Sequence, residues 1–176
     1  MALDEHKFKS LIHYVCWRCR QDPSTLGAVK LNKILWLSDF RAYYDTGDSI
    51  TGARYVKRQF GPVPSRITSA LRDLQTEGAI SVGEAQFRGF PKAEYTVHRD
   101  PNTAEFKPDE LAIVDKVIEF VCNEHTAKSI SEMSHDHVWQ VAGEGEEIPY
   151  YTIFAVPGQI TDDEREWARQ ELEELK

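Results

Sequence analysis

Apolar residues recur at helical spacing through much of the chain, and this spacing predicts most of its secondary structure. Residues 4–20 carry one apolar stripe, which indicates an amphipathic helix; its members are Phe8, Leu11, Ile12, Val15, Cys16 and Cys19. The same spacing predicts helices over 65–77, 109–125 and 127–134. Thr126 is a suitable N-cap for the last of these, because a hydroxyl oxygen can accept a hydrogen bond from a backbone N–H of the first turn.

A helix predicted over residues 26–44 is apolar on more sides than one packing face requires. Leucine and isoleucine residues mark one side, and Trp36 and Phe40 extend the apolar surface around the rest. Such a helix is either central to the core or open to a partner, and the pattern leaves both alternatives open. Residues 45–48, which include Gly47, should end it.

Shorter runs of β-forming residues lie between the helices. Residues 54–60 (RYVKRQF) predict a strand, and residues 61–65 (GPVPS) predict a turn. Residues 79–82 and 93–98 predict a two-stranded ribbon, and residues 148–154 a last strand or extended piece. The expected fold class is therefore mainly α (α+β), a compact helical domain with a small β-sheet or ribbon.

The composition is that of an ordinary globular protein. The 176 residues are 41% hydrophobic and 28% charged, and the net charge is −8. This charge argues against wholesale binding to nucleic acid or anionic lipid, although it permits a local basic face. No stretch is long enough to span a membrane, the N-terminus lacks the apolar region of a secretory signal, and three cysteines favour free thiols over disulfides. We therefore expect a cytoplasmic protein with no membrane partner.

The chain divides into three parts by pattern. Residues 1–25 should form a helix packed on the domain, residues 26–140 the domain itself, and residues 141–176 a C-terminal extension. In that extension Thr161 and Glu164 match a capping box, which opens a charged terminal helix.

Cys16 and Cys19 have the spacing of a redox pair. A low-pKa redox cysteine usually sits at a helix N-terminus, whereas these two come late in a predicted helix, on its apolar stripe. Packing in the core explains them better, because free cysteine is among the most buried residue types. We expect both to be reduced thiols.

His135 and His137, with Glu132 and the Glu124–His125 pair upstream, come nearest to a zinc site. Zinc needs three or four converging ligands, and a bare His-x-His has little specificity, so hydrogen bonding at a helix end explains the histidines better. The chain also lacks the nucleophile-elbow, phosphate-loop and zinc-protease motifs. We therefore predict no metal, no cofactor and no catalytic residue, and hence a protein that is not an enzyme.

Between Ser49 and Arg72 the chain is basic and holds no acid; its bases are Arg54, Lys57, Arg58, Arg66 and Arg72. A helix over 65–77 followed by a β-ribbon resembles the end of a winged-helix module, in which a basic helix enters the major groove. This favours a DNA-binding regulator as an alternative function. The strand and prolines before that helix count against it, because a tight helix-turn-helix needs another helix there.

Four segments are more distinctive than composition explains. They read KLNKILWLSDF at 30–40, ITGARYV at 50–56, FGPVPS at 60–65 and SISEMSHDHVW at 129–139. Together they resemble the SocA-like or Panacea antitoxin domain, over about residues 30–140, and the Gly-Pro pair after a strand is the most specific part.

The resemblance implies an antitoxin, which neutralises a cognate toxin by direct contact and has no catalytic residues. The family is associated with bacteria, phages and mobile elements, and one similar protein delivers its toxin to a protease, so a protease adaptor is a further alternative. The candidate partner-binding residues are Trp36, Phe40, Arg54, Tyr55, Lys57, Arg58, Phe60, Pro62, His135 and Trp139. Strand alternation should send Lys57 to the opposite side from Arg54 and Arg58.

Overall fold

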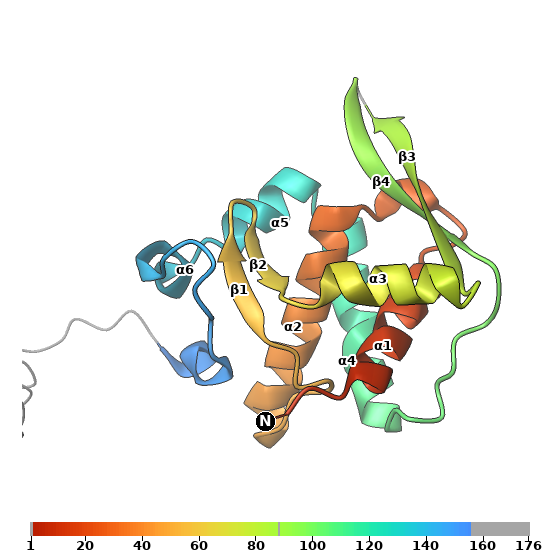
Figure 1. Ribbon diagram of the computed structural model, residues 1–176. Helices are drawn as coiled ribbons and strands as arrows, with labels where there is room; N and C mark the ends of the chain where they lie inside the picture. The colour runs from red at the N-terminus through yellow and green to blue at the C-terminus, as the bar shows by residue number, and fades with distance from the viewer. Residues whose placement is uncertain (1, 88, 156–176) are drawn as a thin grey trace, which may run out of the picture.

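One helix lies at the centre of the fold (Figure 1), in a computed structural model that describes residues 2–87 and 89–155. This helix, α2 (Ala28–Thr46), contacts α1 (Glu5–Arg18), α4 (Pro108–Glu119) and α5 (Ala127–Met133). Because neighbours surround it, α2 is apolar around most of its circumference. The expected mainly α class with small antiparallel sheets is confirmed.

Local signals set the ends of the helices. Asp4 caps α1 and accepts a hydrogen bond from the Lys7 N–H at 3.0 Å. Gly47 ends α2 with φ at 81°, a left-handed conformation that glycine adopts at little cost. Thr126 caps α5 as predicted, accepting from the Ser129 N–H at 3.1 Å.

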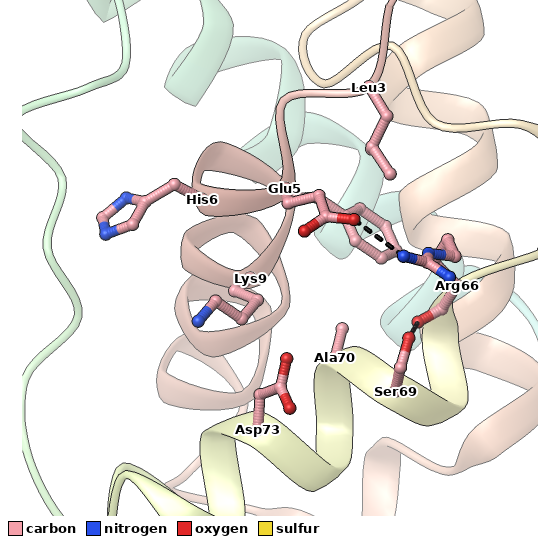
Figure 2. A pocket seen from close by; sticks show the side chains of 9 residues that line it. Leu3, Glu5, His6, Lys9, Arg66, Ser69, Ala70 and Asp73 are labelled. Carbon is pink, nitrogen blue, oxygen red and sulfur yellow. Dashed lines mark hydrogen bonds and ion pairs between the residues drawn. The ribbon is translucent and has the colours of Figure 1, made fainter.

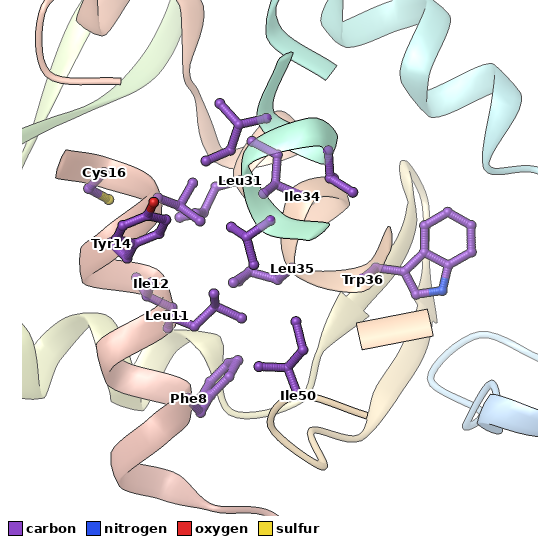
Figure 3. Packing of buried hydrophobic residues seen from close by; sticks show 14 of the residues in the cluster. Phe8, Leu11, Ile12, Tyr14, Cys16, Leu31, Ile34, Leu35, Trp36 and Ile50 are labelled. Carbon is purple, nitrogen blue, oxygen red and sulfur yellow. The ribbon is translucent and has the colours of Figure 1, made fainter. Parts of the chain in front are cut away.

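The hydrophobic core is one continuous cluster that runs from Phe8 in α1 to Ile148 near the end of the described chain. Figure 3 shows α1 side chains such as Leu11 facing Ile34 and Leu35 of α2, all of them fully buried. Burying one such side chain stabilises the fold by about 1.5–3 kcal/mol, so α1 is part of the domain's core.

A β-hairpin stands beside α2. Its strands are β1 (Tyr55–Arg58) and β2 (Gly61–Pro64), so the predicted turn at residues 61–65 is wrong and the chain turns at residues 59–60 instead. Pro62 and Pro64 lie opposite Lys57 and Tyr55. At these positions the backbone N–H of β2 would point away from β1, so proline loses no ladder hydrogen bond.

The outer edge of β1 pairs with residues 145–148, far along the chain. The Lys57 N–H donates to the Glu146 carbonyl and the Ile148 N–H to the Tyr55 carbonyl, each at 2.8 Å. This pairing brings an acidic segment to the hairpin.

A second ribbon follows α3 (Ile67–Thr76). Its strands, β3 (Ile80–Phe87) and β4 (Phe90–Val97), confirm the predicted helix and ribbon, and the strands run longer than expected. In Figure 1 this ribbon projects from the helical body. A short 3₁₀ helix, η1 (Pro23–Thr25), connects α1 to α2.

The C-terminal part differs from expectation at α6 (His137–Val141) and at residues 148–154. After α4, a π-helical turn η2 (Phe120–Glu124) completes the predicted long helix. Asp136, expected in a loop, caps α6 and accepts from the Trp139 N–H at 2.8 Å. The extended piece predicted at residues 148–154 is wrong, because Tyr150–Phe154 forms a 3₁₀ helix, η3, whose aromatic side chains contact α2. The terminal helix predicted from Thr161 lies outside the described residues.

Candidate partner-binding surface

The structure separates the candidate binding residues into two groups. One group is buried: Trp36, Phe40, Tyr55 and Pro62. The other lies at the surface or partly exposed around the hairpin: Arg54, Lys57, Arg58, Phe60, His135 and Trp139.

The three aromatic residues of the buried group belong to an aromatic cluster centred on Phe40, which is only 3% exposed. Its ring centroid lies 5.5 Å from Trp36, 5.7 Å from Tyr55 and 4.9 Å from Tyr150. Such pairs add about 0.5–1.5 kcal/mol beyond the apolar area that they bury. Trp36 and Phe40 therefore stabilise the packing of α2 against β1 and η3.

Asp39 lies fully buried inside this aromatic cluster, and the sequence reasoning missed it. Its carboxylate accepts hydrogen bonds from the Thr51 N–H at 2.8 Å, the Thr51 hydroxyl at 2.6 Å and the Tyr55 hydroxyl at 2.7 Å. Burial raises the pKa of Asp39, and the bonds from Thr51 and Tyr55 oppose that rise. An aspartate among the apolar residues of the predicted helix at 26–44 was the available signal.

We call the surface formed by Lys57, Arg58, Phe60, His135 and Trp139 the hairpin surface. Side chains of the C-terminal helices hold the hairpin backbone in place: the Ser131 hydroxyl donates to the Phe60 carbonyl at 3.2 Å and Trp139 Nε1 to the Arg58 carbonyl at 3.1 Å. Phe60 itself, at the turn, is 54% exposed. An apolar ring thus projects from a fixed backbone.

Lys57, His135 and Trp139 form a stack beside that ring. The imidazole of His135 lies on the Trp139 indole with centroids 3.6 Å apart, and Lys57 Nζ lies 4.3 Å from the indole centroid. Lys57 Nζ also donates to the Ala142 carbonyl at 2.8 Å. Burial lowers the pKa of His135, and the positive charges of Lys33 and Lys57 add to this.

Lys33 lies underneath the hairpin and is 1% exposed. Its ammonium nitrogen donates to the Pro62 carbonyl at 3.3 Å, and Gly61 leaves the space that this nitrogen fills. Burial lowers the pKa of Lys33 to about 7. A lysine on the apolar stripe of α2 was a signal that the sequence reasoning did not use.

Acidic residues offset the basic charges of the hairpin. Arg54 pairs with Glu147 at 2.7 Å and Arg58 with Glu144 at 3.3 Å, and both arginines are largely exposed, as strand alternation predicts. Lys57 lies on the other side, against α6. The acid-free stretch seen in the sequence is therefore not an unpaired basic patch in the fold.

A groove of about 250 Å³ opens beside the hairpin surface, between α2 and η3. It is lined by Trp36, Leu37, Phe40, Arg41, Pro62, Asp136, Ile148, Thr152, Ile153 and Ala155. Trp36 Nε1 is buried and has no hydrogen-bond partner among the described residues. Tyr151 and Phe154 of η3 are also exposed, which places further apolar surface near the C-terminal end of α2.

Comparison with known proteins decides the family. The model of the family described as antitoxin SocA-like, Panacea domain matches residues 31–140, which is more than half of the chain. This chain belongs to that family. No curated protein and no solved structure matches it.

The Panacea match contains both groups of candidate residues. It spans α2 through α6, so the aromatic cluster and the hairpin surface are mostly built from family residues. Two features near the hairpin lie outside it: the acids at 144–147 and the η3 helix. In this Panacea protein these flanking parts form ion pairs with Arg54 and Arg58 and pack aromatic rings against Phe40 and Tyr43 of α2.

The histidines considered for zinc do not converge. His135 stacks on Trp139, and His137 is exposed in the first turn of α6. Within residues 2–87 and 89–155, no three histidine, cysteine, aspartate or glutamate side chains are grouped as a metal would require. No helix in the same ranges is both long and apolar enough to cross a membrane.

The winged-helix alternative rests on α3 and the following ribbon, which have the order that it requires. Figure 2 shows Arg66, at the start of α3, directed to Glu5 of α1, with its guanidinium 2.8 Å from the carboxylate. Asp73 of α3 lines a groove together with Arg66 and Glu5. Acids thus accompany the bases on this face, which weakens it as a phosphate-binding surface.

Proposed function

We propose that this chain is an antitoxin that neutralises a cognate toxin by direct contact through the hairpin surface. Family membership supports an antitoxin-like role with a toxin as partner. The observation that carries the choice of surface is Phe60, a 54% exposed aromatic ring within the family region. Aromatic anchors of this kind provide much of the affinity of protein interfaces.

The supports behind Phe60 favour the same surface. Because Ser131 and Trp139 bond the carbonyls of Phe60 and Arg58, the turn does not have to be ordered on binding. A preorganised anchor loses less conformational entropy than a mobile one, so more of its contact energy is retained as affinity.

The basic charge of the hairpin should contribute less to toxin binding than the sequence indicated. Arg54 and Arg58 already face Glu147 and Glu144, so their pull on a distant acidic partner is partly cancelled. We therefore expect the apolar contact of Phe60 to set most of the affinity, with the arginines affecting the association rate.

The test is co-expression with the product of the adjacent reading frame, followed by growth rescue and co-purification. We expect Phe60→Ala to weaken the complex about tenfold or more, as for an aromatic hot spot, while the melting temperature stays nearly unchanged. Tyr44→Ala is the matched control, since Tyr44 is an aromatic residue with the same 54% exposure at the far end of α2.

Four outcomes would oppose the proposal. Rescue without a detectable complex would exclude neutralisation by contact, and equal losses in Phe60→Ala and Tyr44→Ala would exclude the hairpin as the specific surface. A fall in toxin level that requires a host protease would favour the adaptor alternative. Tight, sequence-specific DNA binding at physiological salt would favour the regulator alternative.

A further inference from the structure

Two cysteines distant in sequence meet at the edge of the core. Cys19 is the C-cap residue of α1, and Cys122 lies in the π-helical turn that ends α4. Their sulfur atoms are 4.0 Å apart, although the residues are separated by 103 positions. The partner of Cys19 is therefore Cys122 and not Cys16, its neighbour in the Cys-x-x-Cys spacing.

The surroundings of Cys122 favour its thiolate. The hydrogen bond shared by the Cys19 and Cys122 sulfurs and the positive charges of Lys30 and Lys92 lower the pKa of Cys122, and burial opposes them. Lys30 Nζ also donates to the Cys122 carbonyl at 3.2 Å. Cys16 differs, because burial raises the pKa of its thiol to about 12.

Accessibility also differs among the three thiols. Cys122 is half-buried, Cys19 is 8% exposed and Cys16 is 1% exposed. A small oxidant can therefore reach Cys122 first, with Cys19 directly behind it. Redox-sensing cysteines have this arrangement: an accessible sulfur of thiolate character beside a resolving thiol.

We propose that Cys122 and Cys19 form a reversible, peroxide-responsive disulfide pair. The Cys122 thiolate attacks a peroxide oxygen, which is reduced, and the products are Cys122 sulfenic acid and hydroxide. The Cys19 thiol then attacks the sulfenic sulfur, a sulfur–sulfur bond forms and one water leaves. A dithiol reductant reverses the step by thiol–disulfide exchange.

The approach that this bond needs is short. A disulfide requires sulfur atoms about 2.05 Å apart, so the two must approach by about 2 Å from their present 4.0 Å. The bond joins the end of α1 to the end of α4 across a long loop. Because it constrains the unfolded chain, we expect the oxidised protein to melt at a higher temperature than the reduced protein.

The experiment uses the full-length protein treated with hydrogen peroxide, then alkylated and analysed by peptide mass spectrometry without reduction. We expect a linked peptide that contains Cys19 and Cys122, loss of two free thiols, and return of both after dithiothreitol. Cys16→Ala is the matched control and should leave this result unchanged. In the Cys19→Ala variant, Cys122 should still be oxidised, but no disulfide should form because the resolving thiol is missing.

The disulfides and free thiols found in the wild-type protein by mass spectrometry are enough to contradict the inference, even if a variant folds poorly. Three free thiols after peroxide, a link between Cys16 and Cys19, a link between two molecules, or Cys122 oxidised beyond the sulfenic state without a disulfide would each contradict it. The test needs no toxin, so its result is independent of the function proposed above.

Discussion

Phe40 and Phe60 are both aromatic residues in the most distinctive part of the sequence, yet the fold uses them in opposite ways. Phe40 is 3% exposed and contacts three other aromatic rings, whereas Phe60 is 54% exposed at a hairpin turn. The first lies on a helix that neighbours surround, and the second on a turn with only its backbone held. An aromatic residue can therefore stabilise either the core or an interface, and its position in the fold decides which.

The polar groups of the two regions also differ in burial: those of the aromatic cluster are buried, and the arginines of the hairpin are exposed. In the aromatic cluster, Asp39 accepts hydrogen bonds from Thr51 and Tyr55 and is sealed from water. At the hairpin, Arg54 and Arg58 make exposed ion pairs that water and salt weaken. Substitutions in the first region should affect stability, and those in the second should affect binding.

The largest effect is expected for Asp39→Ala. It leaves the buried donors of Thr51 and Tyr55 without an acceptor, so we expect a loss of about 3–5 kcal/mol in the free energy of unfolding, measured with urea. Asp39→Asn keeps the shape and one acceptor, and should cost less than half as much. An Asp39→Ala protein as stable as wild type would show that the buried hydrogen bonds of the aromatic cluster do not stabilise the fold.

Trp36→Ala should have the next largest effect. Trp36 is 8% exposed, and its removal opens a cavity, which typically costs about 3–5 kcal/mol and about 10 °C in melting temperature. Trp36→Phe should cost much less, because it keeps a ring and removes Nε1, a donor that has no partner within residues 2–87 and 89–155. If Trp36→Ala instead weakens toxin binding while its melting temperature barely changes, Trp36 belongs to the interface.

Lys33 predicts a pH dependence of stability that comes from beneath the hairpin. The pKa of Lys33 is about 7 in the folded protein against 10.5 in the unfolded chain, so between these values the unfolded chain binds more protons. Stability should therefore rise with pH in this window, by about 2 kcal/mol from pH 7.5 to 9, and level off below 7.

Lys33→Met is the control that isolates this contribution. The variant keeps the length of the side chain without its charge, so the rise attributable to Lys33 should vanish while changes from other groups remain. Urea unfolding of both proteins at several pH values gives the difference. Parallel curves for the two proteins would show that Lys33 keeps an ordinary pKa.

The smallest effect is expected at the ion pairs of the hairpin. Arg58→Ala removes an exposed pair with Glu144, which should change the free energy of unfolding by less than about 0.5 kcal/mol. Glu144→Ala should cost as little, and it should speed association with an acidic toxin at low salt, because it frees the arginine charge. Stopped-flow association rates of both proteins at two salt concentrations test this. Equal rates for Glu144→Ala and wild type would show that the arginine charge does not affect association.

Much of the fold could be predicted from the sequence, because local patterns specify helices and ribbons. The stripe of α1, the cap at Thr126 and the ribbon after α3 follow from spacing and turn residues alone. The strand at Gly61–Pro64 could not be recognised in this way, since two prolines suit a strand only where the neighbouring chain leaves their nitrogens unused. The 3₁₀ helix η3 was missed because contacts with α2 hold it.

The candidate site shows the same limit. The sequence by itself determined the family, the helical class and the set of residues worth testing, because these depend on residue identity and on spacing within short segments. Only the tertiary structure decided that Trp36 is buried, that Arg58 faces Glu144 and that Cys19 meets Cys122. These are contacts between residues many positions apart, and they form only when the buried core brings distant segments together.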